Sequence, residues 1–304
     1  MDQAHAVNGA DEFRHDKTDE RFWNESIYLD LIDASGTIGG YVRLGLYPNE
    51  QRAWWTAAVT FEDRGPVVSG IYDFAVEPGP EFSCDRGSDQ VRYLVHEPLQ
   101  RVQVLSATAA KAYDTAADAY DPSAGRDVFL EIDLTWETAG TPFHYAVTTR
   151  YEIPCTASGS VTIDGEVFTL SGPAQRDHSW GVRDWWTYGW CWAALHFDDG
   201  QELHLAHIRV DGVPALGYVQ GDGDVRALTS LDVTEVTNGE GLASVAHVTA
   251  EPGGFDVTVT PTGYGPLLLV ADDGRVSRFP RAMVRCQRAD GVAGLGWIEW
   301  NQPQ

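Results

Sequence analysis

The sequence predicts an all-β protein made of two successive antiparallel barrels or sandwiches. Apolar and polar residues alternate with a period of two in many short segments, such as Ser26–Asp33 and Ile38–Tyr47, as they do in half-buried strands. Turn dipeptides such as Asp164-Gly165 and Asn238-Gly239 recur between these segments. No long segment shows a competing helical period. A chain of 304 residues is long enough for two such units.

The first half of the chain contains the clearest strand signals. Strands are expected at residues 26–33, 38–47, 52–61, 67–76, 91–96, 99–105, 127–137 and 145–153. The first two flank the turn Ala34-Ser35-Gly36 and are expected to form a hairpin. The alanine-rich stretch Ser106–Tyr120 is the exception, and a short surface helix or an inserted loop is expected there.

The second half repeats the β pattern, with Gly-containing turns at short intervals. We therefore expect a flexible N-terminal arm over residues 1–20, which are polar and charged, a first β domain over 21–175 and a second over 176–304.

Composition excludes several classes of partner. The formal net charge is -24, from 45 acidic and 21 basic side chains, and such a surface repels nucleic acids and anionic lipid. No signal peptide and no apolar run long enough to cross a bilayer is seen, so a cytoplasmic protein is expected. The four cysteines are far apart and are expected to be free thiols. No phosphate loop, dinucleotide fingerprint or nucleophile elbow occurs, so no cofactor is expected.

Gly172–Trp192 is the stretch with the most chemistry. It places five ionisable side chains among large aromatic residues, and a charged group that loses water must form a pair, form hydrogen bonds or change its pKa. A reactive site and a buried structural ion-pair network explain these features equally well. The ionisable residues are Arg176, Asp177, His178, Arg183 and Asp184.

A strand over Trp185–Phe197 would carry an aromatic ladder on one face. Such a ladder is either plain core or the wall of a ligand pocket. Its members are Trp186, Tyr188, Trp190 and Trp192, and Ala194 and His196 continue the same face.

Two further candidates lie outside this stretch. His204 and His207 alternate along an expected strand and point to opposite faces, so no metal site is expected from them. Glu299 shares a strand face with Trp297. It is either an edge carboxylate in water or, if that face lines the barrel interior, a second acid of the site.

The motif Gly172-x-x-x-Arg-Asp-His-Ser-Trp-Gly-x-Arg-Asp-Trp185, followed by Trp190-Cys-Trp-Ala-Ala-Leu-His-Phe-Asp-Asp-Gly200 and a closing Gly294-x-Gly-x-x-Glu299, resembles the carotenoid 1,2-hydratase (hydroxyneurosporene synthase) and AttH-like superfamily. The resemblance implies two tandem lipocalin-like β-barrels with the motif near their junction. Enzymes of this architecture include hydratases of isoprenoid double bonds and cyclases of the Diels–Alder type, so the resemblance implies one of these activities.

In the hydratase branch the His-x-Trp pair belongs to the active site, which carries over to His178 and Trp180. That branch also uses a Tyr and an Asp on a following strand, where this sequence offers His204 and His207. The absence of this Tyr and Asp bears on hydration as the reaction, but not on the presence of the shared pocket.

Two functions are expected from these observations. The first is a cofactor-independent enzyme that hydrates, isomerises or cyclises a large hydrophobic molecule of isoprenoid, steroid or polyene type by acid–base chemistry. His178 and Asp177 would lie at the core of a proton-transfer site. As neighbours on a strand they point to opposite faces, so either one could face the cavity while the other is held by Arg176 or Arg183. Trp180 would shape the site, and Arg176, Arg183 and Asp184 would support it. The aromatic ladder with His204 and Glu299 would bind ligand. The alternative is a lipocalin-like carrier of hydrophobic ligands without turnover.

Overall fold

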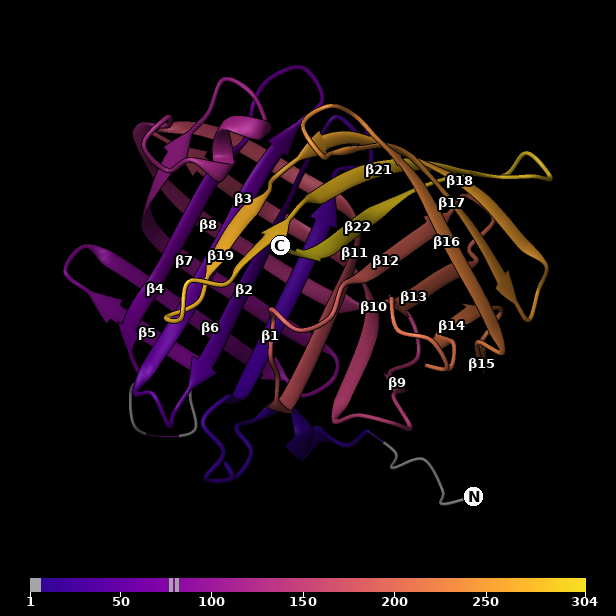
Figure 1. Ribbon diagram of the computed structural model, residues 1–304, viewed down its shortest axis with the longest axis horizontal. Helices are drawn as coiled ribbons and strands as arrows, with labels where there is room; N and C mark the ends of the chain where they lie inside the picture. The colour runs from indigo at the N-terminus through magenta and orange to yellow at the C-terminus, as the bar shows by residue number, and fades with distance from the viewer. Residues whose placement is uncertain (1–6, 77–78, 80–81) are drawn as a thin grey trace.

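The computed structural model describes residues 7–76, 79 and 82–304. Within these residues it contains strands, two short 3-10 helices and no α-helix, and all strand pairings are antiparallel. Two large sheets pack side by side, with the N-terminal sheet on the left of Figure 1 and the C-terminal sheet on the right. No helix of the described chain is long and apolar enough to span a membrane.

The first sheet closes into a barrel. Its strands run in the order β4-β3-β2-β1-β11-β10-β8-β7, and β7 pairs again with β4 through Val67 and Ala112. The short β5 and β6 extend it beyond β7, and β9 pairs with β10. The bounds are β1 Trp23–Ile32, β2 Ile38–Tyr47, β3 Arg52–Phe61, β4 Val67–Ala75, β5 Phe82–Arg86, β6 Asp89–Glu97, β7 Arg101–Ala112, β8 Arg126–Thr138, β9 Phe143–His144, β10 Arg150–Ile163 and β11 Glu166–Val182.

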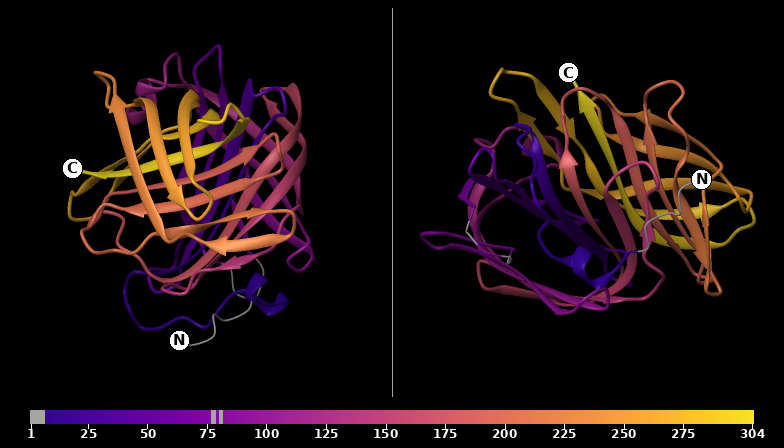
Figure 2. Two further views of the ribbon diagram at one scale, coloured as in Figure 1. Left: turned by 90° about the vertical axis from the view of Figure 1, so that its right-hand side faces the viewer. Right: turned by 90° about the horizontal axis from the view of Figure 1, so that it is seen from below.

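The second sheet is a curved wall in the order β15-β14-β13-β12-β22-β21-β18-β17-β16, to which the hairpin β19–β20 is attached through β22. Figure 2 shows it leaning against the first barrel. The bounds are β12 Trp190–Phe197, β13 Glu202–Ile208, β14 Leu216–Gly221, β15 Asp224–Ala227, β16 Ser230–Thr237, β17 Ala243–Glu251, β18 Phe255–Tyr264, β19 Leu267–Val270, β20 Val276–Phe279, β21 Arg281–Arg288 and β22 Ala293–Pro303.

The all-β prediction is confirmed, while three local expectations need correction. Residues 106–112 continue β7, because pairing with β8 along its whole length overrides the helix propensity of alanine. The expected helix shrinks to the 3-10 turn η2 at Ala117–Tyr120. Residues 145–149 lie before β10 and are not in a strand. The expected boundary at residue 175 falls inside β11, whose pairing with β1 keeps it in the first sheet as far as Val182.

The N-terminal segment, where it is described, is fixed to the first barrel. Residues 1–6 of the expected flexible arm lie outside the described residues. Gly9–Glu12 form the 3-10 helix η1, which Asn8 caps. Glu12 is fully buried and pairs with Arg176 of β11 at 2.7 Å. The right-hand view of Figure 2 shows this segment at the mouth of the barrel.

Three apolar cores hold the molecule together. One fills the first barrel, a second lies under the C-terminal sheet, and a third fills the junction between the two. Strand alternation divides residues between them: Leu29 and Leu31 of β1 face the barrel, whereas Tyr28 and Ile32 face the junction. All four cysteines are buried and free, as expected.

Tryptophan indoles tie the junction with hydrogen bonds as well as apolar area. Trp297 of β22 is 1% exposed and donates from Nε1 to the carbonyl oxygen of Leu31 on β1 at 2.8 Å. Trp185 donates to the hydroxyl of Tyr47 at 3.0 Å. Because a buried acceptor that loses its donor is left unsatisfied, these bonds fix how the two sheets meet.

We predict that Trp297→Phe lowers the free energy of unfolding by about 1–3 kcal/mol, because it leaves the Leu31 carbonyl without its donor and shrinks a buried ring. Urea unfolding followed by circular dichroism measures the change. Val236→Ala, at a 59% exposed strand position, is the control and should shift the midpoint little. Equal midpoints for Trp297→Phe and the wild type would contradict the assigned role of this bond.

Candidate functional site

A cavity of about 800 Å³ opens at the junction of the two sheets. Both sheets and the connection between β11 and β12 contribute to its wall, so the site exists only where the two halves meet. Its aromatic and ionisable lining residues are Tyr28, Arg43, Tyr145, Arg150, Asp177, Arg183, Asp184, Trp185, Tyr188, Trp190, Trp192, Arg281 and Glu299.

Asp177 reaches this cavity because successive side chains of β11 point to opposite faces of the sheet, one inside the barrel and one at the junction. Arg176 and His178 bond with groups inside the first barrel, whereas Asp177 lines the junction cavity. Asp177 is 5% exposed, and its Oδ2 accepts a hydrogen bond from Arg150 Nη2 at 2.7 Å. The carboxyl group therefore stands at the cavity wall with a cation beside it.

Burial raises the pKa of Asp177 to about 7. The Arg150 guanidinium opposes this rise, and the neighbouring Glu152 carboxylate adds to it. At neutral pH a large fraction of Asp177 therefore holds a proton and can donate it.

Arg150 also anchors a network that crosses between the sheets. Its Nε donates to Glu152 Oε1 at 2.7 Å, and that oxygen accepts from Trp192 Nε1 of β12 at 3.1 Å. The other Glu152 oxygen accepts from Gln175 Nε2 at 3.0 Å. The network satisfies the buried Glu152 and positions Arg150 toward Asp177.

Tyr145 presents its ring to the cavity, and its hydroxyl bonds to His204 Nε2. His204 is 1% exposed, and it packs behind Tyr145 rather than lining the cavity. Burial, together with the charge of Arg150, lowers the pKa of His204 well below its usual value. His204 is therefore a neutral support for Tyr145.

Glu299 lines the same cavity from the second sheet. Its Oε2 lies 2.7 Å from Arg281 Nε, and its Oε1 accepts from Trp190 Nε1 at 3.4 Å. The predicted parity is confirmed here, since Trp297 faces the junction while Ile298 and Trp300 face the second core. Two acidic residues from different sheets thus share one cavity.

The aromatic wall differs from the expected ladder. Strand β12 begins only at Trp190, because residues 183–189 form the connection from the first sheet. Trp190, Trp192 and the exposed Tyr188 line the junction cavity. Trp186 turns away, donates to the Leu269 carbonyl at 3.2 Å and lines a separate cavity of about 430 Å³.

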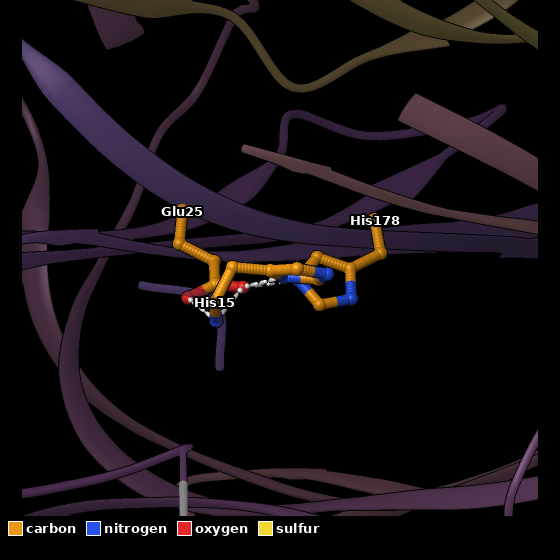
Figure 3. A group of neighbouring side chains, drawn as sticks. All are labelled: His15, Glu25 and His178. Atoms are coloured by element: carbon orange, nitrogen blue, oxygen red, sulfur yellow. Dashed lines mark hydrogen bonds and ion pairs between the residues drawn. The ribbon is translucent and has the colours of Figure 1, made fainter. Parts of the chain in front are cut away.

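The barrel-facing side chains of β11 form a second polar group. His178 Nε2 lies 3.0 Å from Glu25 Oε1, and its Nδ1 lies 3.3 Å from the hydroxyl of Tyr151. His15 Nδ1 also contacts Glu25 Oε1, at 2.7 Å, and the His15 ring stacks on Trp180 with 3.6 Å between centroids. Figure 3 shows both imidazoles close to the carboxylate of Glu25, whose Oε1 contacts each of them.

The ligand atoms of His15, Glu25 and His178 lie within 4.8 Å of one another, and their types suit a divalent cation such as zinc. The sequence analysis expected no metal site and missed this group, because His178 and Glu25 are 153 residues apart. Hydrogen bonds join the three side chains. Burial acts to raise the pKa of Glu25, but the bonds from both histidines outweigh it and lower that pKa.

The structure thus separates residues that the sequence analysis placed in one site. Asp177, Arg183 and Asp184 border the junction cavity, whereas Arg176, His178 and Trp180 belong to the barrel interior. Asp184 is held by Arg275 at 3.2 Å. Sequence reasoning missed Arg43, Arg150, Tyr145 and Arg281. For Arg43 the signal was present, since alternation in β2 puts it on one face with Tyr41 and Tyr47.

Solved structures share this fold over nearly the whole chain. A protein described as an AttH candidate from Nitrosomonas europaea is 15% identical with a TM-score of 0.65, covering 98% of this chain and 97% of that one. Kievitone hydratase from Nectria haematococca is 11% identical with a TM-score of 0.62, covering 98% and 94%. CghA is 11% identical with a TM-score of 0.57, covering 93% and 88%. At such low identities, the TM-scores and coverages show a shared fold and nothing about function.

The AttH part of the sequence resemblance is supported at the level of the fold, and no carotenoid hydratase is among these structures. No curated protein matches the sequence. A family model described as a domain of unknown function, DUF7064, matches residues 8–304. The chain therefore belongs to the DUF7064 family.

Proposed function

We propose that the junction cavity is the active site of a cofactor-independent enzyme in which Asp177 protonates a large, mainly apolar small molecule. The observation that carries the proposal is a buried carboxyl group that opens into a cavity of about 800 Å³ and has a pKa of about 7. A carrier has no use for a proton donor in its binding wall, and burying one costs stability. Kievitone hydratase, which shares the fold, is a hydratase by name.

In the proposed step the Asp177 proton moves to a carbon of a substrate double bond, whose π electrons form the new C–H bond. The Asp177 carboxylate left behind is paired with Arg150, which already lies 2.7 Å away. The resulting carbocation is stabilised by the faces of Trp190 and Trp192, each worth roughly 0.5–2 kcal/mol. Addition of water with loss of one of its protons completes a hydration, and loss of a proton from carbon completes an isomerisation. Attack by a second double bond closes a ring and leaves a new cation, which loses a proton to complete a cyclisation.

Glu299 is the proposed base on the opposite wall. Loss of a proton from the cation, or from an attacking water, needs an acceptor within the cavity, and Glu299 lines it from the second sheet. Arg281 Nε lies 2.7 Å from Glu299 Oε2 and holds this carboxyl group at the wall. His178 and Trp180 take a positioning role in this proposal, because they hold β11 and His15 together inside the barrel.

We predict that Asp177→Asn lowers turnover by ~10²–10⁴-fold while substrate still binds, since it removes the proton and keeps the shape. A panel of isoprenoid, steroid and polyene compounds is incubated with the protein in D2O, and mass spectrometry detects the deuterium that protonation leaves on carbon. Asp184→Asn is the matched control and should keep full turnover, because Asp184 is paired with Arg275 and its pKa is lowered.

The same panel separates the enzyme from the carrier. Compounds that bind and are returned without deuterium or any other change would favour a lipocalin-like carrier and contradict the proposal. Normal turnover by Asp177→Asn would exclude Asp177 as the donor.

The pH profile follows from the raised pKa of Asp177. An acid catalyst must be protonated, so we predict that kcat/KM falls above about pH 7, by roughly tenfold per pH unit. Asp177→Asn should lose this dependence along with most of its activity. A rate that rises through pH 7 would show that Asp177 acts as a base instead.

Ligand binding should change the fluorescence of Trp190 rather than that of Trp186, because Trp190 lines the junction cavity and Trp186 lines the separate one. We predict that a bound polyene quenches tryptophan fluorescence, that Trp190→Phe reduces the quenched fraction, and that Trp186→Phe leaves it unchanged. Fluorescence titration of the two variants measures this. A larger loss in Trp186→Phe would place the ligand in the separate cavity.

A further inference from the structure

Two of the four arginines that line the junction cavity lack a close ion pair with any residue that the structure describes. Arg150 pairs with Glu152 and Asp177, and Arg281 pairs with Glu299. Among the residues that the structure describes, Arg43 and Arg183 form no ion pair within 4.0 Å. The chain has 45 acidic and only 21 basic side chains, so an arginine without a nearby carboxylate is unexpected in this sequence.

Arg43 is the more constrained of the two. It is 5% exposed on β2, it lines the cavity, and its Nη2 is buried without a hydrogen-bond partner in the described chain. A buried guanidinium nitrogen without a partner is costly, so an acceptor from outside the chain would satisfy it. Gly45 leaves the space that Arg43 occupies, since a Cβ there would lie 2.6 Å from Arg43 Nη1.

Arg183 approaches the same place from the β11–β12 connection. The guanidinium carbons of Arg43 and Arg183 lie 4.7 Å and 5.5 Å from the centre of the Trp185 ring. Burial lowers the pKa of Arg183 to about 10, and the positive charges of Arg150 and Arg43 add to this effect. This end of the cavity therefore carries excess positive charge.

We infer that the substrate carries a carboxylate, which Arg43 and Arg183 bind beside Trp185, while its apolar part lies against Trp190 and Trp192. A guanidinium matches the planar carboxylate with parallel hydrogen bonds. The ring of Trp185 lies against both guanidiniums by cation–π contact and so helps to position them. The inference rests on the proposed function, because it assigns a substrate class to that cavity.

Retinoic acid and its methyl ester test the inference, since they share one polyene and differ in charge. Tryptophan quenching at pH 7.5 gives the dissociation constant of each. We expect wild-type protein to bind the acid about 10- to 100-fold more tightly than the ester, as expected for hydrogen bonds to a charged group. Sodium chloride at high concentration should weaken binding of the acid more than binding of the ester.

The variants locate the subsite. Arg43→Met and Arg183→Met should each reduce the preference for the acid at least fivefold and leave the affinity for the ester unchanged. Gly45→Ala keeps the charge but displaces the Arg43 guanidinium, and it should also reduce the preference. Arg275→Met is the matched control, because Arg275 pairs with Asp184 and lines the separate cavity. Near-ultraviolet circular dichroism checks that each variant is folded. If Arg43→Met does not fold, Arg183→Met still tests the subsite, because the Arg183 side chain is only half-buried.

The outcomes separate this inference from the proposed function. Equal affinity for acid and ester would overturn the carboxylate subsite while leaving the apolar cavity intact. A preference for the acid that survives both arginine variants would overturn the assignment to Arg43 and Arg183. Binding of neither compound, or quenching that follows Trp186 instead of Trp190, would overturn the proposed cavity and the carboxylate subsite with it.

Discussion

One guanidinium shared between two buried carboxyl groups sets the chemistry of the junction. Arg150 contacts both Glu152 and Asp177 at 2.7 Å, on neighbouring strands of the first sheet. A single positive charge cannot neutralise two carboxylates in a poorly hydrated space, so one of them tends to keep its proton. Glu152 has hydrogen bonds from Gln175 and Trp192, whereas Asp177 faces the cavity. The proton is therefore held where a ligand can reach it.

Local alternation explains how much of this was predictable. The parity around Glu299 and the opposite orientation of Asp177 and His178 follow from a period of two within one strand. The hairpin of β1 and β2 follows from the turn signal between them. The sequence could not show which environment each face meets. His178 was assigned to the same site as Asp177, yet one face of β11 is inside the barrel and the other is at the junction.

Long-range pairing explains what was missed. Arg150 reaches Asp177 only because β10 and β11 are paired, and Glu25 reaches His178 only because β1 pairs with β11. Glu12 reaches Arg176 because the N-terminal segment enters the barrel. Such contacts join residues far apart in sequence, and no local pattern encodes them. The aromatic ladder failed at Trp186 for a related reason, since the chain must leave the first sheet before β12 begins.

An anionic substrate would also change the pKa of Asp177, the proposed acid. Arg183 lowers the pKa of Asp177, and Arg43 in turn acts on Arg183. A carboxylate bound between these arginines would cancel part of their positive charge and add a negative charge near Asp177. Both effects raise the pKa of Asp177 further, because a nearby anion disfavours the ionised carboxyl group. The His178 group, on the opposite face of β11, bonds with Glu25 and Tyr151 and does not line the cavity. On the proposed mechanism, a bound anionic substrate would therefore help Asp177 to keep its proton until the proton is transferred. The contacts of His178 inside the barrel would meanwhile keep β11 in place.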